Sequence, residues 1–274
     1  RKSRQLLNTF KPQIAIGVGG FASGPLLYAA SRRNLPTLIQ EQNSFPGITN
    51  RILAKRVDCI CTGFEKMEKW FPADRIVHTG NPLRRGIQDL TDKSDEGKRH
   101  FKLTQGGPIV FVMGGSLGAH SMNTAVQNAL EDLKKANIQV IWQTGSRYFK
   151  SIESEIDLKA YPNISVVDFI GRMDLAYAAS DLIVSRAGAM SIAELALVGK
   201  PTILVPSPNV AEDHQTRNAE ALTKSNAAIL LADKEVGTQF FASVTALLNN
   251  NEQRVTMSAN MKSIARPKAA AAVV

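Results

Sequence analysis

The feature that most constrains this chain is the alternation of short apolar runs with longer helical patterns from Pro108 onward. The apolar runs are rich in β-branched residues, and Gly or Pro punctuates each of them, which is typical of buried strands. Strands are expected at residues 109–113, 139–143, 165–169, 182–185, 202–205 and 228–231, and helices at 120–135, 148–158, 173–179, 191–198 and 215–225. Strands joined by helices form a parallel sheet with helices on both faces. Residues 108–274 are therefore predicted to form a Rossmann-like domain.

The first third of the chain repeats this pattern in a shorter form. Strands are expected at residues 14–18, 37–40 and 59–62, and helices at 25–33 and 47–54. We predict an α/β fold of two Rossmann-type domains whose parallel sheets face a cleft: 1–89, a polar linker region 90–107, and 108–274. Because the chain has no initiator Met and its ends lie within helical patterns, we expect a fragment whose first domain is incomplete. A sheet without its opening strand exposes edges, so this domain should be the less stable one.

Basic residues are concentrated near the N-terminus. The net charge is +9; residues 1–86 hold 14 Lys and Arg against 5 Asp and Glu, whereas residues 106–274 hold 15 of each. This excess favours an anionic ligand or an anionic membrane surface. The sequence has no basic cluster interleaved with aromatic residues, so it gives no indication of nucleic acid binding. No apolar run approaches the ~18 to 20 residues that span a bilayer.

Three glycine-rich turns follow predicted strands, at residues 17–25, 114–119 and 186–191. Glycines let the backbone approach a ligand, and the start of the next helix offers free N–H groups to a phosphate. After the third turn, Ser191 and Glu194 have the spacing of a capping box. Alternatively, Glu194 accepts hydrogen bonds from the vicinal hydroxyls of a ribose. The spacing alone leaves both interpretations open.

Polar residues follow two further strands. Gln215 and Asn218 share a helix face suited to sugar hydroxyls, although Asp213 as a helix cap explains the same loop. Gln40 to Asn43 close a strand, and Arg84 could neutralise a phosphate. The sequence has no P-loop, no Asp-x-Asp and no metal-ligand spacing among its four histidines. It therefore predicts no metal and no cofactor, with phosphates held by loops, helix dipoles and arginine.

These motifs occur in a recognisable order: GVGGFASGP, QEQNSFPGITNRILAK, GNPLRR, VMGGSLGAHSMN, SRAGAMSIAELALVGKP and EDHQTRNA. In that order they resemble the MurG family of bacterial peptidoglycan glycosyltransferases over nearly the whole chain. The resemblance implies a GT-B fold and an inverting transfer of N-acetylglucosamine from UDP-N-acetylglucosamine to undecaprenyl-pyrophosphoryl-muramoyl-pentapeptide, converting lipid I to lipid II. It also implies a cytoplasmic, peripheral enzyme on the inner face of the cell membrane.

The resemblance assigns expected roles to individual residues. The Ile170 backbone should meet the uracil, Glu194 the ribose, and the start of the following helix the diphosphate. The donor-binding residues that it implies are Asn43, Arg84, Ser116, Ile170, Arg186, Gly188, Ala189, Met190, Ser191, Ile192, Ala193, Glu194, Gln215 and Asn218. The acceptor-binding residues that it implies are Gly17, Gly19, Gly20 and Asn50.

The chain also departs from the family pattern. The family's first strand and its Gly-Gly-Thr-Gly-Gly-His loop are absent, and Gln40 stands where many members have histidine. An inverting transfer needs a base, and Glu41 is the one candidate that the sequence offers. Two alternatives remain open: another GT-B enzyme of UDP-sugars, or a catalytically incomplete UDP-sugar-binding fragment. An NAD-dependent oxidoreductase is disfavoured, because Gln143 and Thr144 stand where an acidic ribose ligand is needed.

Overall fold

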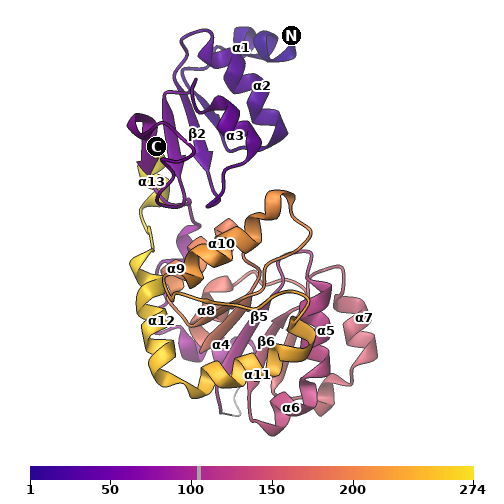
Figure 1. The fold of residues 1–274 in the computed structure, drawn as a ribbon. Coiled ribbons are helices and arrows are strands. Elements are labelled where there is room, and N and C mark those ends of the chain that lie inside the picture. The colour runs from indigo at the N-terminus through magenta and orange to yellow at the C-terminus, as the bar shows by residue number, and fades with distance from the viewer. Residues whose placement is uncertain (104–105) are drawn as a thin grey trace. The chain divides into compact units, whose positions relative to one another are not determined.

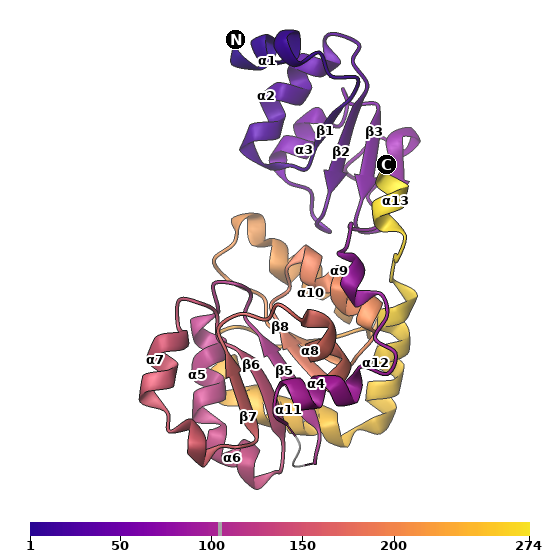
Figure 2. The same cartoon turned by 180° about the vertical axis from the view of Figure 1, so that it is seen from behind.

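The computed structural model describes residues 1–103 and 106–274, which form two compact units. The N-terminal unit comprises residues 1–83 and 266–274, and the C-terminal unit comprises residues 84–265. Each unit contains one sheet of parallel strands together with helices (Figures 1 and 2). The predicted α/β class with two parallel sheets is confirmed. Within the described residues, no helix combines the length and apolarity that a membrane crossing needs.

The N-terminal unit has a four-stranded sheet in the order β1-β2-β3-β4. Its strands are β1 Ala15–Gly17, β2 Thr37–Glu41, β3 Cys59–Thr62 and β4 Ile76–His78, and its helices are α1 Lys2–Phe10, α2 Gly20–Ser31, α3 Ile48–Leu53, η1 Ala73–Arg75 and α13 Ala269–Val273. Leu27, Ile39 and Ile60 lie in a core formed between the sheet and the helices. The strand order places the carboxyl ends of β1, β2 and β3 side by side.

The C-terminal unit has a six-stranded sheet in the order β10-β9-β8-β5-β6-β7. Its strands are β5 Ile109–Met113, β6 Gln139–Gln143, β7 Ile164–Val167, β8 Leu182–Ser185, β9 Thr202–Leu204 and β10 Ile229–Leu230. Its helices are η2 Arg85–Ile87, α4 Ser94–His100, α5 His120–Asn128, α6 Leu130–Lys135, α7 Phe149–Glu155, η3 Leu158–Ala160, α8 Met173–Ala179, α9 Ala189–Val198, η4 Ala211–Asp213, α10 His214–Thr223, α11 Val236–Asn249 and α12 Asn251–Ser263.

Helices cover both faces of this larger sheet, as its continuously apolar strands require. Val110 and Val112 of β5 pack in one cluster with Met122 of α5 and Phe240 of α11. Phe111 points to the other face, where its ring meets Tyr177 of α8 edge-on at 5.7 Å. Figure 2 shows α4 and α8 together on that second face. Since the central strands are buried on both sides, their polar side chains appear where the strands end.

Five segments are predicted correctly to the residue: β3, β5, β6, β8 and α8. Other predicted boundaries are wrong. The expected helix 120–135 is interrupted at Ala129, which lies near φ −95° and ψ 0° and separates α5 from α6. Strand β7 ends at Val167, and the expected strand residue Phe169 is 58% exposed. Helix α2 begins at Gly20 rather than at Pro25, which lies inside it.

The two units differ from the expected domain ranges in two places. The linker region 90–107 contains α4, which packs closely on α8: a Cβ on Gly97 would lie 2.4 Å from the Leu175 carbonyl oxygen. At the C-terminus, residues 266–274 join the N-terminal unit, where Arg266 pairs with Glu65 at 2.9 Å. A Cβ on Gly80 would meet the Arg266 side chain, so glycine permits this close packing.

We expect backbone amides of β2 and β3 to exchange with solvent faster than those of β5, β6 and β8. The N-terminal core is smaller, and β1 lies at the end of its described sheet with Ile16 53% exposed. Less buried apolar surface lowers the free energy of local unfolding. Native-state hydrogen exchange followed by mass spectrometry measures the difference. Equal protection of the two sheets would contradict it.

Candidate functional site

Helix α9 starts directly beyond the carboxyl end of β8 and leaves its first turn without a side-chain cap. Its N-cap is Gly188 in an extended conformation, and no side chain accepts a capping hydrogen bond there. Ser191 lies inside the first turn, so the capping-box interpretation of Ser191 and Glu194 is wrong. The helix therefore directs free N–H groups and the positive end of its dipole to the space beyond β8.

A pocket of about 520 Å³ opens at this helix start. It is lined by Gly114, Gly115, Gly118, Ala119, His120, Ser121, Tyr148, Arg186, Gly188, Ser191, Ser207, Pro208, Asn209, Gln215 and Asp233. The structure thus brings together four residues predicted to bind the donor: Arg186, Gly188, Ser191 and Gln215. All lie at the carboxyl edge of the sheet, where open α/β proteins bind ligands.

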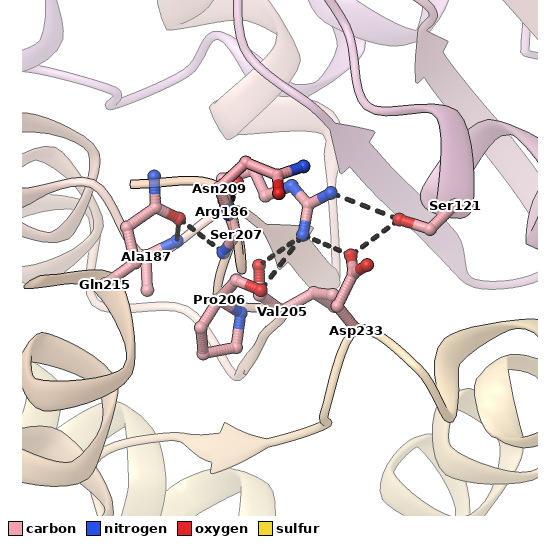
Figure 3. A network of polar contacts seen from close by, with 9 residues as sticks. All are labelled: Ser121, Arg186, Ala187, Val205, Pro206, Ser207, Asn209, Gln215 and Asp233. Carbon is pink, nitrogen blue, oxygen red and sulfur yellow. Dashed lines mark hydrogen bonds and ion pairs between the residues drawn. The ribbon is translucent and has the colours of Figure 1, made fainter. Parts of the chain in front are cut away.

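Arg186 joins four segments of the chain around this pocket (Figure 3). One guanidinium nitrogen, Nη1, donates to the carbonyl oxygens of Val205 and Pro206 at 3.1 Å each and lies 2.5 Å from Asp233 Oδ1. The other, Nη2, donates to Ser121 Oγ at 3.1 Å, and Ser121 donates to Asp233 at 2.6 Å. The predicted donor ligand Arg186 is therefore held as a brace that connects β8, β9, α5 and the segment after β10.

Helix α10 holds the loop that follows β8. The side-chain oxygen of Gln215 accepts hydrogen bonds from the N–H groups of Ala187 at 3.2 Å and Ser207 at 2.9 Å. Asn218 is fully buried and donates to the Ala187 carbonyl at 3.3 Å. Asp213 occupies the N-cap position, but its side chain makes no capping bond. Gln215 thus turns its amide nitrogen away from Ala187 and Ser207 (Figure 3), whereas Asn218 positions the backbone.

Glu194 is buried and uses its two oxygens differently. Oε1 lies 3.0 Å from Arg84 Nε, and Oε2 accepts a hydrogen bond from the Tyr177 hydroxyl at 2.9 Å. Tyr177 is fully buried, and burial together with the Glu194 charge raises the pKa of its hydroxyl well above the ordinary value. The hydroxyl therefore stays protonated and donates to Glu194 at physiological pH.

The glycines of the 114–119 turn have different tasks. A Cβ on Gly118 would lie 2.0 Å from the Thr144 carbonyl oxygen, and a Cβ on Gly145 would lie 2.1 Å from the Gly118 nitrogen. These two glycines let two backbone turns touch. Gly115 has φ +90° and no atom within 4 Å of its Cβ position. Only Gly115 keeps open space for a ligand, while Ser116 is exposed beside it.

In the N-terminal unit, Glu41 is only 3% exposed and holds the loop that follows β2. Its Oε1 accepts from the Asn43 N–H at 2.9 Å, and its Oε2 accepts from the Gly47 N–H at 3.1 Å and from Asn50 Nδ2 at 2.8 Å. A buried carboxylate occupied in this way is poorly placed to take a proton from a substrate hydroxyl. In the structure Glu41 thus orders the loop after β2, and its catalytic role stays a prediction.

The first glycine turn also combines packing with an open helix start. A Cβ on Gly17 would lie 2.1 Å from Leu27 Cδ1, so this glycine serves packing. Gly19 and Gly20 have φ values of +83° and +75° and begin α2, which has no side-chain cap. Asn50 lies beside Gly19. Three of the four predicted acceptor residues therefore surround one helix N-terminus.

Most of the remaining predicted residues are buried or partly buried. Ile170, Ala189 and Ile192 are buried, Ala193 is partly buried, and Met190 is 39% exposed. Sequence reasoning missed Tyr177, Ser121 and Asp233. Asp233 follows a predicted strand, and this position could have marked it as a site residue. Tyr177 lies in an apolar helix, where the sequence predicts a core residue. Across the described ranges, no cluster of three or more His, Cys, Asp or Glu side chains could hold a metal ion.

Comparison with known proteins identifies the family. The model of the glycosyltransferase family 28 C-terminal domain matches residues 109–273, and that of the N-terminal domain matches residues 1–62. A curated relative from Cytophaga hutchinsonii is 50% identical over all of this chain and 73% of its own length. The chain belongs to the MurG family of glycosyltransferases. That relative is named UDP-N-acetylglucosamine–N-acetylmuramyl-(pentapeptide) pyrophosphoryl-undecaprenol N-acetylglucosamine transferase. A relative of the same name from Parabacteroides distasonis is 46% identical over all of this chain and 74% of its own length.

Solved structures agree with this assignment. The crystal structure of Acinetobacter baumannii MurG aligns with a TM-score of 0.79 and 29% identity over 97% of this chain and 73% of that one. The UDP-GlcNAc 2-epimerase from Neisseria meningitidis bound to UDP-GlcNAc aligns with a TM-score of 0.68 over 98% of this chain and 77% of its own, but at 15% identity it shares the fold alone. The family membership gives no support to the oxidoreductase alternative.

Replacing Asp233 by Ala should lower the affinity for UDP-N-acetylglucosamine and the thermal stability together. The change leaves the partly buried Arg186 guanidinium without its anion, a loss of about 1–3 kcal/mol for a hydrogen bond to a charged group. Calorimetric titration and thermal unfolding measure the two effects. The exposed neighbour Lys234→Ala is the control. An Asp233→Ala protein that matches this control in both measurements would show that the brace is dispensable.

Proposed function

We propose that this chain transfers N-acetylglucosamine from UDP-N-acetylglucosamine to the muramoyl-pentapeptide carried on undecaprenyl pyrophosphate. The structural observation that carries the proposal is the uncapped start of α9 at the pocket of the C-terminal unit. An anionic diphosphate fits such a helix start, because backbone N–H groups and the helix dipole both favour negative charge. Family membership supplies the sugar and the acceptor.

The proposed placement of the donor combines the pocket with the roles that the family resemblance implies. The resemblance places the nucleoside toward Ile170 and Glu194, whose carboxylate would accept hydrogen bonds from the ribose hydroxyls. The diphosphate lies at Gly188 to Ser191 on the first turn of α9. The sugar hydroxyls lie toward Gln215, whose oxygen is held by Ala187 and Ser207, so that its amide nitrogen donates. Gly115 leaves room for the ligand at the opposite wall.

The C-terminal unit stabilises the leaving group electrostatically. When the bond from the sugar to the diphosphate breaks, negative charge develops on UDP. The N–H groups at the start of α9 face this charge in a fixed arrangement, and the Arg186 brace fixes the pocket walls around it. Fixed dipoles lower the barrier because they need no reorganisation during the reaction.

The acceptor contacts the N-terminal unit in this proposal. Gly19 and Gly20 open the uncapped start of α2, which suits the acceptor pyrophosphate for the same physical reason as α9. Glu41 fixes the loop that carries Asn43 and turns the amide of Asn50 toward itself. Glu41 thereby keeps the acceptor side of the unit ordered without taking part in proton transfer.

Glu194→Ala should weaken binding of UDP-N-acetylglucosamine by about 1–3 kcal/mol, because the ribose hydroxyls lose their buried acceptor. Calorimetric titration without added metal measures the loss, with NADH as a ligand that should not bind. Transfer is then tested by following UDP release with the lipid-linked muramoyl-pentapeptide. Folded wild-type protein that fails to bind UDP-N-acetylglucosamine would overturn the proposed donor site.

We further propose that the N-terminal unit rests on an anionic membrane surface at the inner face of the cell membrane. A pocket of about 850 Å³ lies among α1, α2 and α3 and is lined by Arg1, Arg4, Phe21, Tyr28 and Ile52, among others. Phe21 is 97% exposed and Ile52 is 64% exposed. Exposed apolar side chains beside arginines combine insertion into lipid with attraction to anionic headgroups.

Phe21→Ser should reduce binding to vesicles of phosphatidylglycerol and phosphatidylcholine about tenfold, since the transfer of one large apolar side chain is lost. Vesicle sedimentation measures the bound fraction. Val255→Ser, at a 61% exposed position of α12, is the matched control. Wild-type protein that binds pure phosphatidylcholine vesicles equally well would contradict the role of anionic headgroups.

A further inference from the structure

Tyr177 places a single hydroxyl in an apolar environment behind the predicted nucleotide site. The side chain is fully buried in α8, its ring packs edge-on against Phe111, and its oxygen lies 3.7 Å from Met113 Sδ. The strong partner of the hydroxyl is Glu194 Oε2, at 2.9 Å. Burying a hydroxyl is costly unless it makes a hydrogen bond, so this geometry ties Tyr177 to one oxygen of Glu194.

The other oxygen of Glu194 has a partner of a different kind. Arg84 Nε lies 3.0 Å from Oε1, and its side chain is 58% exposed, whereas that of Glu194 is 10% exposed. An ion pair with one solvated member contributes little net stability, because water and salt compete for the exposed guanidinium. The bond to Tyr177 is thus shielded from solvent, and the bond to Arg84 can exchange.

We propose that Tyr177 is a positioning residue for nucleotide recognition: it fixes Oε2 of Glu194 while Oε1 of that carboxylate exchanges Arg84 for the hydroxyls of a ribose. The proposal rests on the proposed function, which places a UDP-sugar at this site. In the empty protein Arg84 occupies the acceptor that the ribose needs. A bound nucleoside diphosphate takes Oε1 with its ribose and attracts the released guanidinium to its phosphates.

Tyr177 has this effect because a carboxylate can rotate about its last side-chain bond. When Arg84 leaves, an unanchored Glu194 would turn to find new partners, and the ribose would have to reorder it. With Oε2 held by a buried donor, Oε1 stays in place throughout the exchange. Such preorganisation improves affinity by reducing the ordering cost of binding.

The test compares Tyr177→Phe with wild type by calorimetric titration of UDP and of 2′,3′-dideoxy-UDP. The variant keeps the ring and removes only the hydroxyl. We expect affinity for UDP to fall about tenfold, while affinity for the dideoxy nucleotide stays within about twofold, because only UDP uses the oriented carboxylate. In the Glu194→Ala background, Tyr177→Phe should cause no further loss of UDP affinity.

Ser180→Ala is the matched control, because it removes another buried hydroxyl just after α8, one that donates to the Tyr177 carbonyl oxygen and not to Glu194. It should leave the preference for UDP over the dideoxy nucleotide unchanged. Should Tyr177→Phe unfold, Tyr177→Met refills the core without a hydroxyl and is titrated in its place. Thermal unfolding confirms that each titrated variant is folded.

The exchange of Arg84 is tested separately, by the affinity for uridine. Uridine has the ribose and no phosphate, so it must displace Arg84 without offering the guanidinium a new partner. Arg84→Met should therefore raise the affinity for uridine about threefold, the gain expected when a weak competing ion pair is removed, and lower the affinity for UDP.

The outcomes separate this inference from the proposed function. Wild-type protein that fails to bind UDP overturns the proposed donor site, and the inference falls with it. Wild-type protein that prefers UDP to the dideoxy nucleotide supports the donor site. In that case, a Tyr177→Phe protein that binds UDP normally, or that loses both ligands equally, overturns the positioning role. Unchanged uridine affinity in Arg84→Met overturns the exchange.

Discussion

The ion pair between Arg186 and Asp233 is the interaction on which the geometry of the proposed donor pocket depends. Strands β8 and β9 and the segment after β10 each end at the same sheet edge, but nothing in strand pairing fixes the chain beyond those ends. Arg186 lies at the exit of β8, and its side chain bonds to the exits of β9 and β10 and to Ser121 of α5. A planar guanidinium with several donors in fixed directions can do this, whereas a lysine ammonium could not match the spread of acceptors. The pocket walls are therefore one connected unit.

The sequence predicted the part of the fold that depends on burial. Strands β5, β6 and β8 are apolar on both faces, so their limits follow from composition alone. Periodicity did not predict the break at Ala129 between α5 and α6 or the short strand β4. The expected domain ranges also could not include the contacts of Gly97 with Leu175 and of Gly80 with Arg266, which join segments far apart in sequence.

The sequence predicted which segments form the candidate site but not the role of each residue in it. Glycine turns and polar strand ends marked the right edge of the sheet, yet the pattern could not distinguish Gly115, which faces open space, from Gly118, which touches Thr144. Residue type alone named Glu41 as a candidate base. The sequence could not show that both of its oxygens accept hydrogen bonds from loop N–H groups and from Asn50, because such hydrogen bonding is a property of the folded chain.

The charge distribution explains how the two units differ in attracting anionic ligands. The C-terminal unit, residues 84–265, carries equal numbers of basic and acidic side chains, so no net positive charge draws a nucleotide toward it. In the proposed donor site, affinity for a diphosphate comes from oriented dipoles at short range, which the uncapped start of α9 supplies. The N-terminal residues carry the basic excess and can attract an anionic surface over about a Debye length, roughly 8 Å at physiological salt. In the proposed function, a soluble donor must fit the short-range contacts of its pocket. A lipid-linked acceptor, by contrast, becomes accessible once the protein has bound the membrane surface that holds it.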